Sequence, residues 1–268
     1  MTGCHRPRDH MADDALADFE SRGYCVVAAT DPATLDRIRA ALRDLAYELV
    51  GAPHGSDDKV GADLDRLHQH VAPGEAATAF RLTLTKAMTE RFDVGRDVFT
   101  AFEAPLARLV GVDVLAQRVP NVVFQPPGDP RPTELHRDAP ANSPYEVVVW
   151  VPFVDCSGTK SMYLLDRAAS HEVLAFHREH HDDPDGFRRL LDARAALMAV
   201  PYGSALLFWP GLFHGSLVNR ETETRLSLNT RFKHLFAPLG MKDPFRYFRI
   251  LHTSPLTRLG LAFEREEG

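Results

Sequence analysis

The chain has 268 residues, of which 44% are hydrophobic, so it is long enough to bury a sizeable core in one domain. Its formal net charge of -6 comes from acidic and basic residues that are interleaved along the chain, without a basic block that could neutralise a phosphate backbone. These properties argue against a nucleic-acid partner.

The sequence offers no membrane segment and no pattern of paired cysteines. No stretch reaches the roughly 18 consecutive apolar residues of a membrane span, and the N-terminus lacks the apolar core of a signal peptide. We therefore expect a soluble, cytoplasmic protein with no membrane partner. Cys4, Cys25 and Cys156 are far apart and in no CxxC pairing, which argues against a disulfide framework, and we expect Cys25 and Cys156 to pack as small apolar residues.

Residues 1–111 predict a helical buttress that contains one early strand, at 24–28. Asp31 and Pro32 are typical of a helix N-terminus, and the following apolar residues recur at spacings of three and four, at Leu35, Ile38, Leu42, Leu45 and Leu49. The polar stretch 52–65 predicts a loop, and a second helical region is expected from about 74 to 110.

From residue 112 the apolar runs shorten to the length of strands, at 119–125, 145–154, 161–165, 203–209, 215–219 and 225–232. A helical insertion is expected at 171–196, and 251–268 is expected to be a C-terminal tail. The pattern predicts a mainly β fold with flanking helices, in which a double-stranded β-helix, or cupin-like jelly roll, occupies 112–250 and packs against the N-terminal helices. We expect one domain over 1–268.

A candidate metal site lies at "ELHRDAPANSPYEVVVW", residues 134–150. Residues two apart in an extended segment point to the same side, so His136 and Asp138 form a natural pair of ligands. His214 stands 76 residues after Asp138, directly before another expected strand. Two imidazoles and one carboxylate on one face of an octahedral ion leave three positions open, as in non-heme iron(II) oxygenases.

A co-substrate is needed for those open positions, and 2-oxoglutarate fills two of them through its keto-acid end. Its far carboxylate then needs a cation, and Arg225, 11 residues after His214, is the favoured candidate. Ser227 lies on the same face as Arg225, and Ser216 is a competing hydroxyl donor. Arg231 has the same strand parity and is the rival cation, six residues beyond Arg225.

Other polar residues are weaker candidates for contacts with the co-substrate, the substrate or a metal. Gln125 and Asn121 share one face of an expected strand and either line the keto acid or form a polar strand end, and Trp150 either borders the co-substrate or belongs to the core. Lys160 either contacts the substrate or lies at a solvated rim, because an unpaired buried lysine would be costly. His177 and His181 are four apart on an expected helix, but Arg178 replaces the glutamate of an HExxH zinc site, which favours a solvated lid.

The order His136-x-Asp138, His214, Arg225 resembles the iron(II)/2-oxoglutarate-dependent oxygenases, and more narrowly their phytanoyl-CoA dioxygenase-like branch. "FQPPGD" before the first histidine, Trp150, the pair Ser170-His171 and "HGS" at His214 all stand in that branch's order, over about 119–232. The sequence departs from the branch at "RAASH", where a Pro-Gly-Ser-His turn is usual.

The resemblance implies an enzyme that uses iron(II), 2-oxoglutarate and O2 to oxidise a C–H bond, with release of succinate and CO2. The stretch 135–166 is most similar to members from carbohydrate-modifying and orthosomycin-type oligosaccharide antibiotic pathways. It implies a saccharide substrate and hydroxylation or oxidative ring closure, such as orthoester or methylenedioxy formation. Two alternatives stay open, a cupin-like metal-dependent sugar isomerase or epimerase and a non-enzymatic sugar-binding barrel, and the sequence leaves the oligomeric state open.

Overall fold

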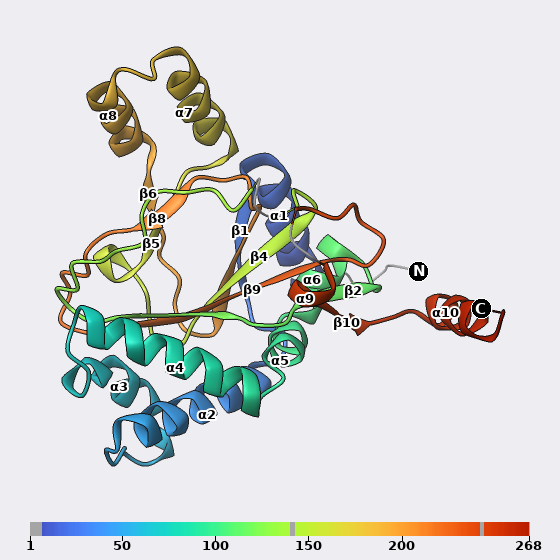
Figure 1. The fold of residues 1–268 in the computed structure, drawn as a ribbon, viewed down its shortest axis with the longest axis horizontal. Helices are drawn as coiled ribbons and strands as arrows, with labels where there is room; N and C mark the ends of the chain where they lie inside the picture. The colour runs from blue at the N-terminus through green and yellow to red at the C-terminus, as the bar shows by residue number, and fades with distance from the viewer. Residues whose placement is uncertain (1–6, 140–142, 242–243, 268) are drawn as a thin grey trace.

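The computed structural model describes residues 7–139, 143–241 and 244–267, and within them the strands form two facing sheets (Figure 1). The larger sheet has the order β1 (Tyr24–Ala28), β7 (Ser204–Phe208), β4 (Glu146–Pro152), β9 (Arg225–His234), β2 (Val114–Gln117) and β10 (Phe248–His252), and β3 (Asn121–Gln125) also pairs with β9. The smaller sheet has the order β6 (Ala196–Leu197), β5 (Met162–Leu164) and β8 (His214–Ser216). The predicted jelly-roll core with flanking helices is therefore confirmed.

Helices flank the two sheets. They are α1 (Pro7–Arg22), α2 (Pro32–Val50), α3 (Val60–Asp65), α4 (Glu75–Arg91), α5 (Val94–Ala101), α6 (Glu103–Val110), α7 (Arg167–Glu179), α8 (Pro184–Arg194), α9 (Pro244–Tyr247) and α10 (Pro255–Glu267), with short 3-10 turns η1 (Asp57–Lys59), η2 (Leu67–Gln69) and η3 (Gly158–Lys160). In Figure 1, α2 and α4 run along the sheet, whereas α7 and α8 stand apart from it. Phe80 of α4 packs on Phe124 of β3, with ring centroids 4.9 Å apart.

The start and end of α2 show how the residues at each end determine where a helix begins and ends. The Asp31 carboxylate accepts a hydrogen bond from the backbone N–H of Thr34 at 3.1 Å, and Pro32 occupies the first turn. Gly51 ends the helix in the left-handed conformation at φ 66°, and its N–H donates to the carbonyl of Glu48. The apolar stripe of α2 then packs into the main core.

The strand β4 is buried along its whole length, which accounts for its uninterrupted apolar sequence. It pairs with β7 on one side and with β9 on the other, so Trp150 lies opposite both Leu206 and Asn229. One face of this sheet packs under the helices, and the other lines the interior of the jelly roll. Because β9 runs beside β4, residues of β9 reach the same interior as Trp150.

Several expected boundaries are wrong. Residues 52–65 are only partly a loop, because Val60 and Leu64 are buried one helical turn apart and residues 57–65 form η1 and α3. The insertion begins at Arg167, since the Asp166 carboxylate caps α7 by accepting from the N–H of Ala169 at 2.8 Å. The "RAASH" segment is thus the first turn of a helix.

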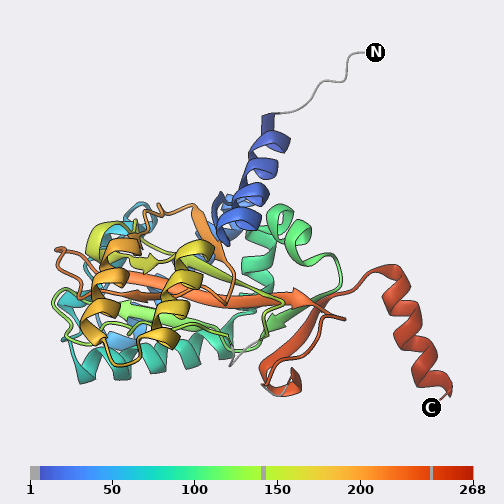
Figure 2. The ribbon, with the colours of Figure 1, turned by 90° about the horizontal axis from the view of Figure 1, so that it is seen from above.

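The C-terminal segment 251–268 is also more ordered than a tail. It contains the end of β10 and the helix α10, and both α1 and α10 extend from the body of the molecule (Figure 2). The two strands β2 and β10 had no counterpart in the expected strands, because each is short and one lies beyond the main apolar runs.

Two further expectations concern membranes and cysteines. Among the described helices, none combines the length and the apolar character that a membrane crossing requires. Cys25 and Cys156 are buried and free, as expected, and burial raises the pKa of their thiols to about 12 and about 11. Cys4 lies outside the described residues.

Candidate metal centre

The structure brings His136, Asp138 and His214 together at the mouth of the jelly roll. The segment around His136 lies antiparallel to β8, and the backbone N–H of each histidine donates to the carbonyl of the other at 3.0 Å. The two imidazole rings are 4.2 Å apart at their centroids. One ligand atom from each of the three residues lies within 4.8 Å of the other two. His214 is the first residue of β8 itself, rather than the residue before a strand.

Backbone carbonyls orient both imidazoles. Nδ1 of His136 lies 2.8 Å from the carbonyl oxygen of Glu134, and Nδ1 of His214 lies 3.0 Å from that of Leu212. A carbonyl oxygen only accepts, so each Nδ1 carries the proton and each Nε2 keeps a free lone pair. Nε2 of His136 lies 3.9 Å from Oδ1 of Asp138. The donor set is therefore two imidazole nitrogens and one carboxylate oxygen, which suits a divalent transition metal such as iron(II).

The charges around the triad keep the ligands in the states that a metal needs. Burial, assisted by the neighbouring His136, lowers the pKa of His214 to about 4, so its imidazole is neutral at neutral pH. Burial raises the pKa of Asp138, but the charge of Arg231 and its hydrogen bond to the carboxylate outweigh burial and hold that pKa below its usual range. Asp138 is thus a carboxylate, with Oδ2 accepting from Arg231 at 2.6 Å.

Arg231 is therefore tied to the candidate metal site and not to a distant part of the barrel. Its guanidinium also donates to Oε1 of Gln117 at 3.1 Å and to the hydroxyl of Tyr247 at 2.9 Å. From its position in the sequence, six residues beyond Arg225, Arg231 was expected further along the same strand. It was considered there as an alternative to Arg225 for binding the far carboxylate of the co-substrate. The pairing with Asp138 was not expected, because Asp138 and Arg231 are 93 residues apart and no local pattern connects them.

Arg225 is buried inside the jelly roll and meets only neutral groups among the described residues. Its Nη1 donates to the carbonyl of Ser161 at 3.1 Å and more weakly to Oε1 of Gln125 at 3.4 Å, and its Nε has no hydrogen-bond partner there. Burial lowers the pKa of Arg225 to about 10, so the group stays cationic at neutral pH. A buried cation with an unused N–H fits the far carboxylate of 2-oxoglutarate.

Four of the remaining predicted co-substrate residues line one of two cavities. Trp150 and Asn121 line one cavity of about 190 Å³ together with the triad, Arg225 and Arg231, and we call it the metal cavity. Gln125 and Ser216 line a neighbouring cavity, and Ser216 accepts from the N–H of Thr133 at 2.8 Å.

Ser227 is the fourth hydroxyl or amide that the sequence offered, and it lines neither of these two cavities. It is fully buried and accepts a hydrogen bond from the indole N–H of Trp150 at 2.9 Å. Since Arg225 lies over the Trp150 ring, 5.4 Å from its centroid, Ser227 positions the ring beside the cation.

Lys160 is neither at a solvated rim nor in the metal cavity. It is only 4% exposed, and its Nζ lies 2.7 Å from Asp65 and 2.5 Å from Glu223. These partners come from α3 and from the segment before β9, so the ion pairs join the helical buttress to the jelly roll. The geometry assigns Lys160 a structural role in place of substrate contact.

The expected lid does not border the metal cavity. Among the described residues that line it or its neighbour, none comes from the insertion 171–196. Phe187 and Leu191 of α8 instead line a separate, largely apolar cavity of about 560 Å³ with Leu135 and Tyr163. His177 is near the end of α7 and His181 lies beyond it, so the two do not share a helix face. The described residues hold no second cluster of metal ligands.

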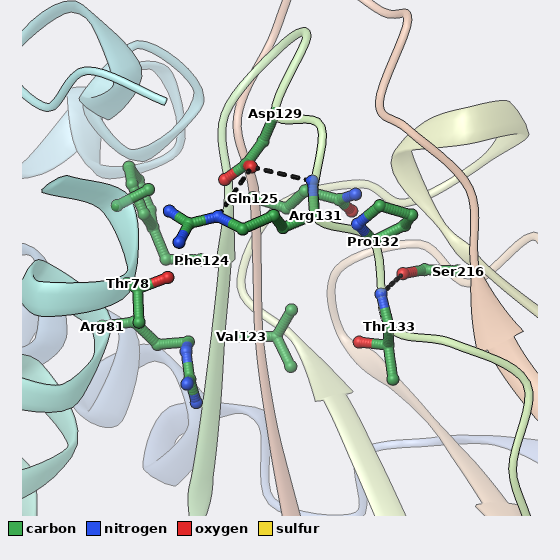
Figure 3. Close-up of a pocket in the computed structure, with 11 residues that line it drawn as sticks. Thr78, Arg81, Val123, Phe124, Gln125, Asp129, Arg131, Pro132, Thr133 and Ser216 are labelled. Carbon is green, nitrogen blue, oxygen red and sulfur yellow. Dashed lines mark hydrogen bonds and ion pairs between the residues drawn. The ribbon is translucent and has the colours of Figure 1, made fainter. Parts of the chain in front are cut away.

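One cavity residue that the sequence did not single out is Arg81 of α4. It lines both the metal cavity and the neighbouring one, which is lined by Ala77, Thr78, Arg81, Val123, Phe124, Gln125, Asp129, Arg131, Pro132, Thr133 and Ser216 and which we call the α4 cavity (Figure 3). The sequence contained a signal for this position. Arg81 is a charged residue on the same helix face as the apolar residues Ala77, Leu84 and Met88, where another apolar residue would be expected.

The chain is similar to a known protein family and to several solved structures. The family described as phytanoyl-CoA dioxygenase (PhyH) matches residues 19–227. AviO1 from Streptomyces viridochromogenes Tue57 is 15% identical, with a TM-score of 0.55 over 85% of this chain and 96% of that chain. HygX from Streptomyces hygroscopicus, solved with nickel and 2-oxoglutarate bound, is 13% identical, with a TM-score of 0.51 over 83% and 87% of the two chains.

A third similar structure is SnoK from nogalamycin biosynthesis, described as a non-heme alpha ketoglutarate dependent carbocyclase. It is 13% identical, with a TM-score of 0.51 over 94% of this chain and 98% of that chain. No curated protein sequence matches the chain. At these identities the similar structures establish a common fold.

Proposed function

Because this chain belongs to the phytanoyl-CoA dioxygenase family, we propose that it oxidises a C–H bond of a small polar metabolite, a sugar or oligosaccharide of an antibiotic pathway. The protein is a non-heme iron(II)/2-oxoglutarate-dependent dioxygenase whose cofactors are iron(II), 2-oxoglutarate and O2. The proposed outcome is hydroxylation or oxidative ring closure, with succinate and CO2 as co-products.

The proposed roles of the residues follow from their contacts. Nε2 of His136, Nε2 of His214 and Oδ1 of Asp138 hold the metal, while Arg231 fixes the second oxygen of Asp138 and so orients the first. Arg225 binds the far carboxylate of 2-oxoglutarate, and Gln125 and Trp150 position its guanidinium. Bound iron(II) and 2-oxoglutarate would supply the oxidising chemistry that cleaves the C–H bond, with O2 as the oxidant.

One observation carries the proposal: a metal-binding triad and a buried arginine without a carboxylate partner face the same cavity. Arg225 itself is almost fully buried, so little water competes for its guanidinium, which strengthens its pairing with a carboxylate. A sugar isomerase or epimerase that uses only the metal has no need of this cation. A sugar-binding barrel needs neither the triad nor the cation.

The experiment mixes the anaerobic protein with Fe(II) and 2-oxoglutarate and records the visible spectrum. A metal-to-ligand charge-transfer band is expected, and His136→Ala should abolish it because one of three ligands is lost. His177→Ala, which removes an exposed histidine from α7, should leave the band unchanged. A colourless wild-type mixture with no thermal shift from 2-oxoglutarate would refute the proposal.

The saccharide is tested separately, by screening candidate oligosaccharides for substrate-dependent release of succinate. A metal-dependent isomerase would change the sugar without succinate, and a binding protein would show affinity without any metal requirement. Succinate release that only non-saccharide metabolites stimulate would reject the sugar but keep the reaction class.

A further inference from the structure

The C-terminal helix α10 leaves the body of the molecule with an apolar face uncovered. Leu256, Leu259 and Phe263 follow one another at spacings of three and four, so they share one helix face, and they are 79%, 70% and 60% exposed. Within the described chain, no other element lies beside α10 in either view (Figures 1 and 2). A helix of 13 residues is only marginally stable in water, so α10 should depend on packing of this face against a partner.

The connection to β10 fixes the direction in which α10 leaves. Only Thr253 and Ser254 separate β10 from α10, and Ser254 donates to the carboxylate of Asp113 through its N–H at 2.6 Å and its hydroxyl at 3.2 Å. The same hydroxyl caps the helix by accepting from the N–H of Thr257 at 3.3 Å, and Pro255 is the first helical residue. A change in the direction of α10 would break these contacts, so the helix is held away from its own chain.

A largely apolar groove of about 480 Å³ lies on the body of the same molecule, between α1, α6 and the segment before β4, and we call it the α6 groove. Phe19, Leu109 and Trp209 line it, and Tyr145 lies in it with more than half of its surface exposed. Gly111 of the groove is two residues before Asp113, so the groove and the origin of α10 are neighbours. A twofold axis beside them would bring α10 of each copy to the groove of the other.

The area of contact favours such a reciprocal arrangement. With a length of about 20 Å and a diameter of about 10 Å, one side of α10 presents roughly 300 Å². A single helix in a single groove would therefore bury about 600 Å² in total, well below the roughly 1,200–2,000 Å² of stable interfaces. Two copies that exchange their helices form two such contacts and reach the lower end of that range. A second copy of the chain thus meets the area requirement, whereas a partner that receives only α10 does not.

We propose that two copies of this chain form a symmetric dimer in which α10 of each copy lies in the α6 groove of the other. The apolar face of α10 and the groove are then covered together, in one twofold interface. This dimer does not depend on the proposed oxidation chemistry.

Sedimentation equilibrium of the full chain over a range of concentrations tests the dimer. The wild type should follow a monomer–dimer equilibrium. Leu259→Glu should weaken dimerisation by at least about a hundredfold, because the charge enters both contacts of a symmetric dimer. Tyr145→Glu should have a similar effect from the groove. Both side chains are mostly exposed in the single chain, so both variants should keep their fold, which circular dichroism checks.

A mixture of the two variants tests the exchange itself. In a heterodimer of Leu259→Glu with Tyr145→Glu, one helix and one groove are both unaltered, so one of the two contacts is intact. The mixture should therefore associate more tightly than either variant alone. No gain in the mixture would overturn the proposal, since it would mean that α10 does not lie in the groove of another copy.

Leu82→Glu is the matched control, because it places the same charge on an exposed leucine of α4. Equal losses in Leu82→Glu and Leu259→Glu, or a wild type that is monomeric at every concentration, would also overturn the proposal. Assemblies larger than a dimer would do the same, because contacts that do not close produce open chains. A monomeric wild type that sediments with anionic lipid vesicles, and loses this property in Leu259→Glu, would assign the apolar face of α10 to a lipid surface instead.

Discussion

At the scale of single residues, each candidate metal ligand has one polar atom that is hydrogen-bonded by the protein. That hydrogen bond orients the other polar atom, which is the one available to a metal. The carbonyls of Glu134 and Leu212 hold Nδ1 of the two histidines, and Nε2 of His136 lies 3.9 Å from Oδ1 of Asp138. Arg231 takes one oxygen of Asp138 and leaves the other for a metal. The ligands are therefore oriented before a metal binds, which reduces the entropy lost on binding.

The two interior arginines of β9 should have separable roles. Arg225→Ala should raise the concentration of 2-oxoglutarate required for half-saturation by at least about tenfold, because a buried charge-assisted pair is lost. Arg231→Ala should change that concentration far less, since Arg231 is already paired with Asp138. Titration of the charge-transfer band with 2-oxoglutarate measures both variants. Equal effects would mean that Arg231 leaves Asp138 to bind the co-substrate.

At the scale of elements, the strand β9 links the site to the rest of the fold. It pairs with β2, β3 and β4, so Arg225 lies opposite Gln125 while Arg231 lies opposite Val148. The segment that leads into β9 carries Glu223, which meets Lys160 and, through it, Asp65 of α3. The helical buttress thus contacts the same strand that supplies both interior arginines.

Lys160→Met should lower the free energy of unfolding by roughly 2 kcal/mol without changing the affinity for 2-oxoglutarate. Breaking a fully buried ion pair costs more, but the Glu223 side chain is 52% exposed, so water compensates part of the loss. Lys59→Met is the control, because Lys59 forms a pair with Asp58 that is exposed on both sides. Urea unfolding measures stability, and a loss of 2-oxoglutarate affinity would contradict the structural role.

The ion pairs of Lys160 should also make the stability of the fold depend on pH. Burial lowers the pKa of Lys160, but the hydrogen bonds to Asp65 and Glu223 outweigh burial and raise that pKa above its usual value. The stabilisation should therefore be complete below the ordinary lysine pKa and be lost as pH rises through the raised value. The difference in stability between wild type and Lys160→Met should shrink in that alkaline range.

At the scale of the whole molecule, the candidate metal site joins parts of the chain that meet only in the folded state. His136 and Asp138 come from the segment before β4, and His214 begins β8 in the smaller sheet. The unfolded chain does not hold these three ligands at binding distance. Metal and co-substrate should therefore bind the folded state selectively and stabilise it.

Adding Mn(II) and 2-oxoglutarate at about 100 times their dissociation constants should raise the melting temperature by roughly 5–10 °C. Chelation of the metal should reverse the rise, and scanning calorimetry measures both steps. His136→Ala should show little of the effect. A similar rise in that variant would indicate that the metal stabilises the protein from another site.

Local sequence determined the fold class and singled out the three metal-binding candidates. The two-residue repeat of a strand puts His136 and Asp138 on one side, and the capping residues with the helix periodicity identified the first residue of α2 and its buried face. These signals are local, since each depends on neighbours within one or two turns. Short strands such as β2 lack such a signal because their burial comes from other elements.

Only the tertiary structure decided which charged residues meet. Asp138 with Arg231, and Lys160 with Asp65 and Glu223, are separated by 63 to 95 residues, and their pairing depends on strand order and helix packing. The same holds for Arg81, which lines the metal cavity because α4 packs on β3. Sequence spacing gives the direction of a side chain along its own element, whereas the partner of a buried charge is set by the contacts between elements.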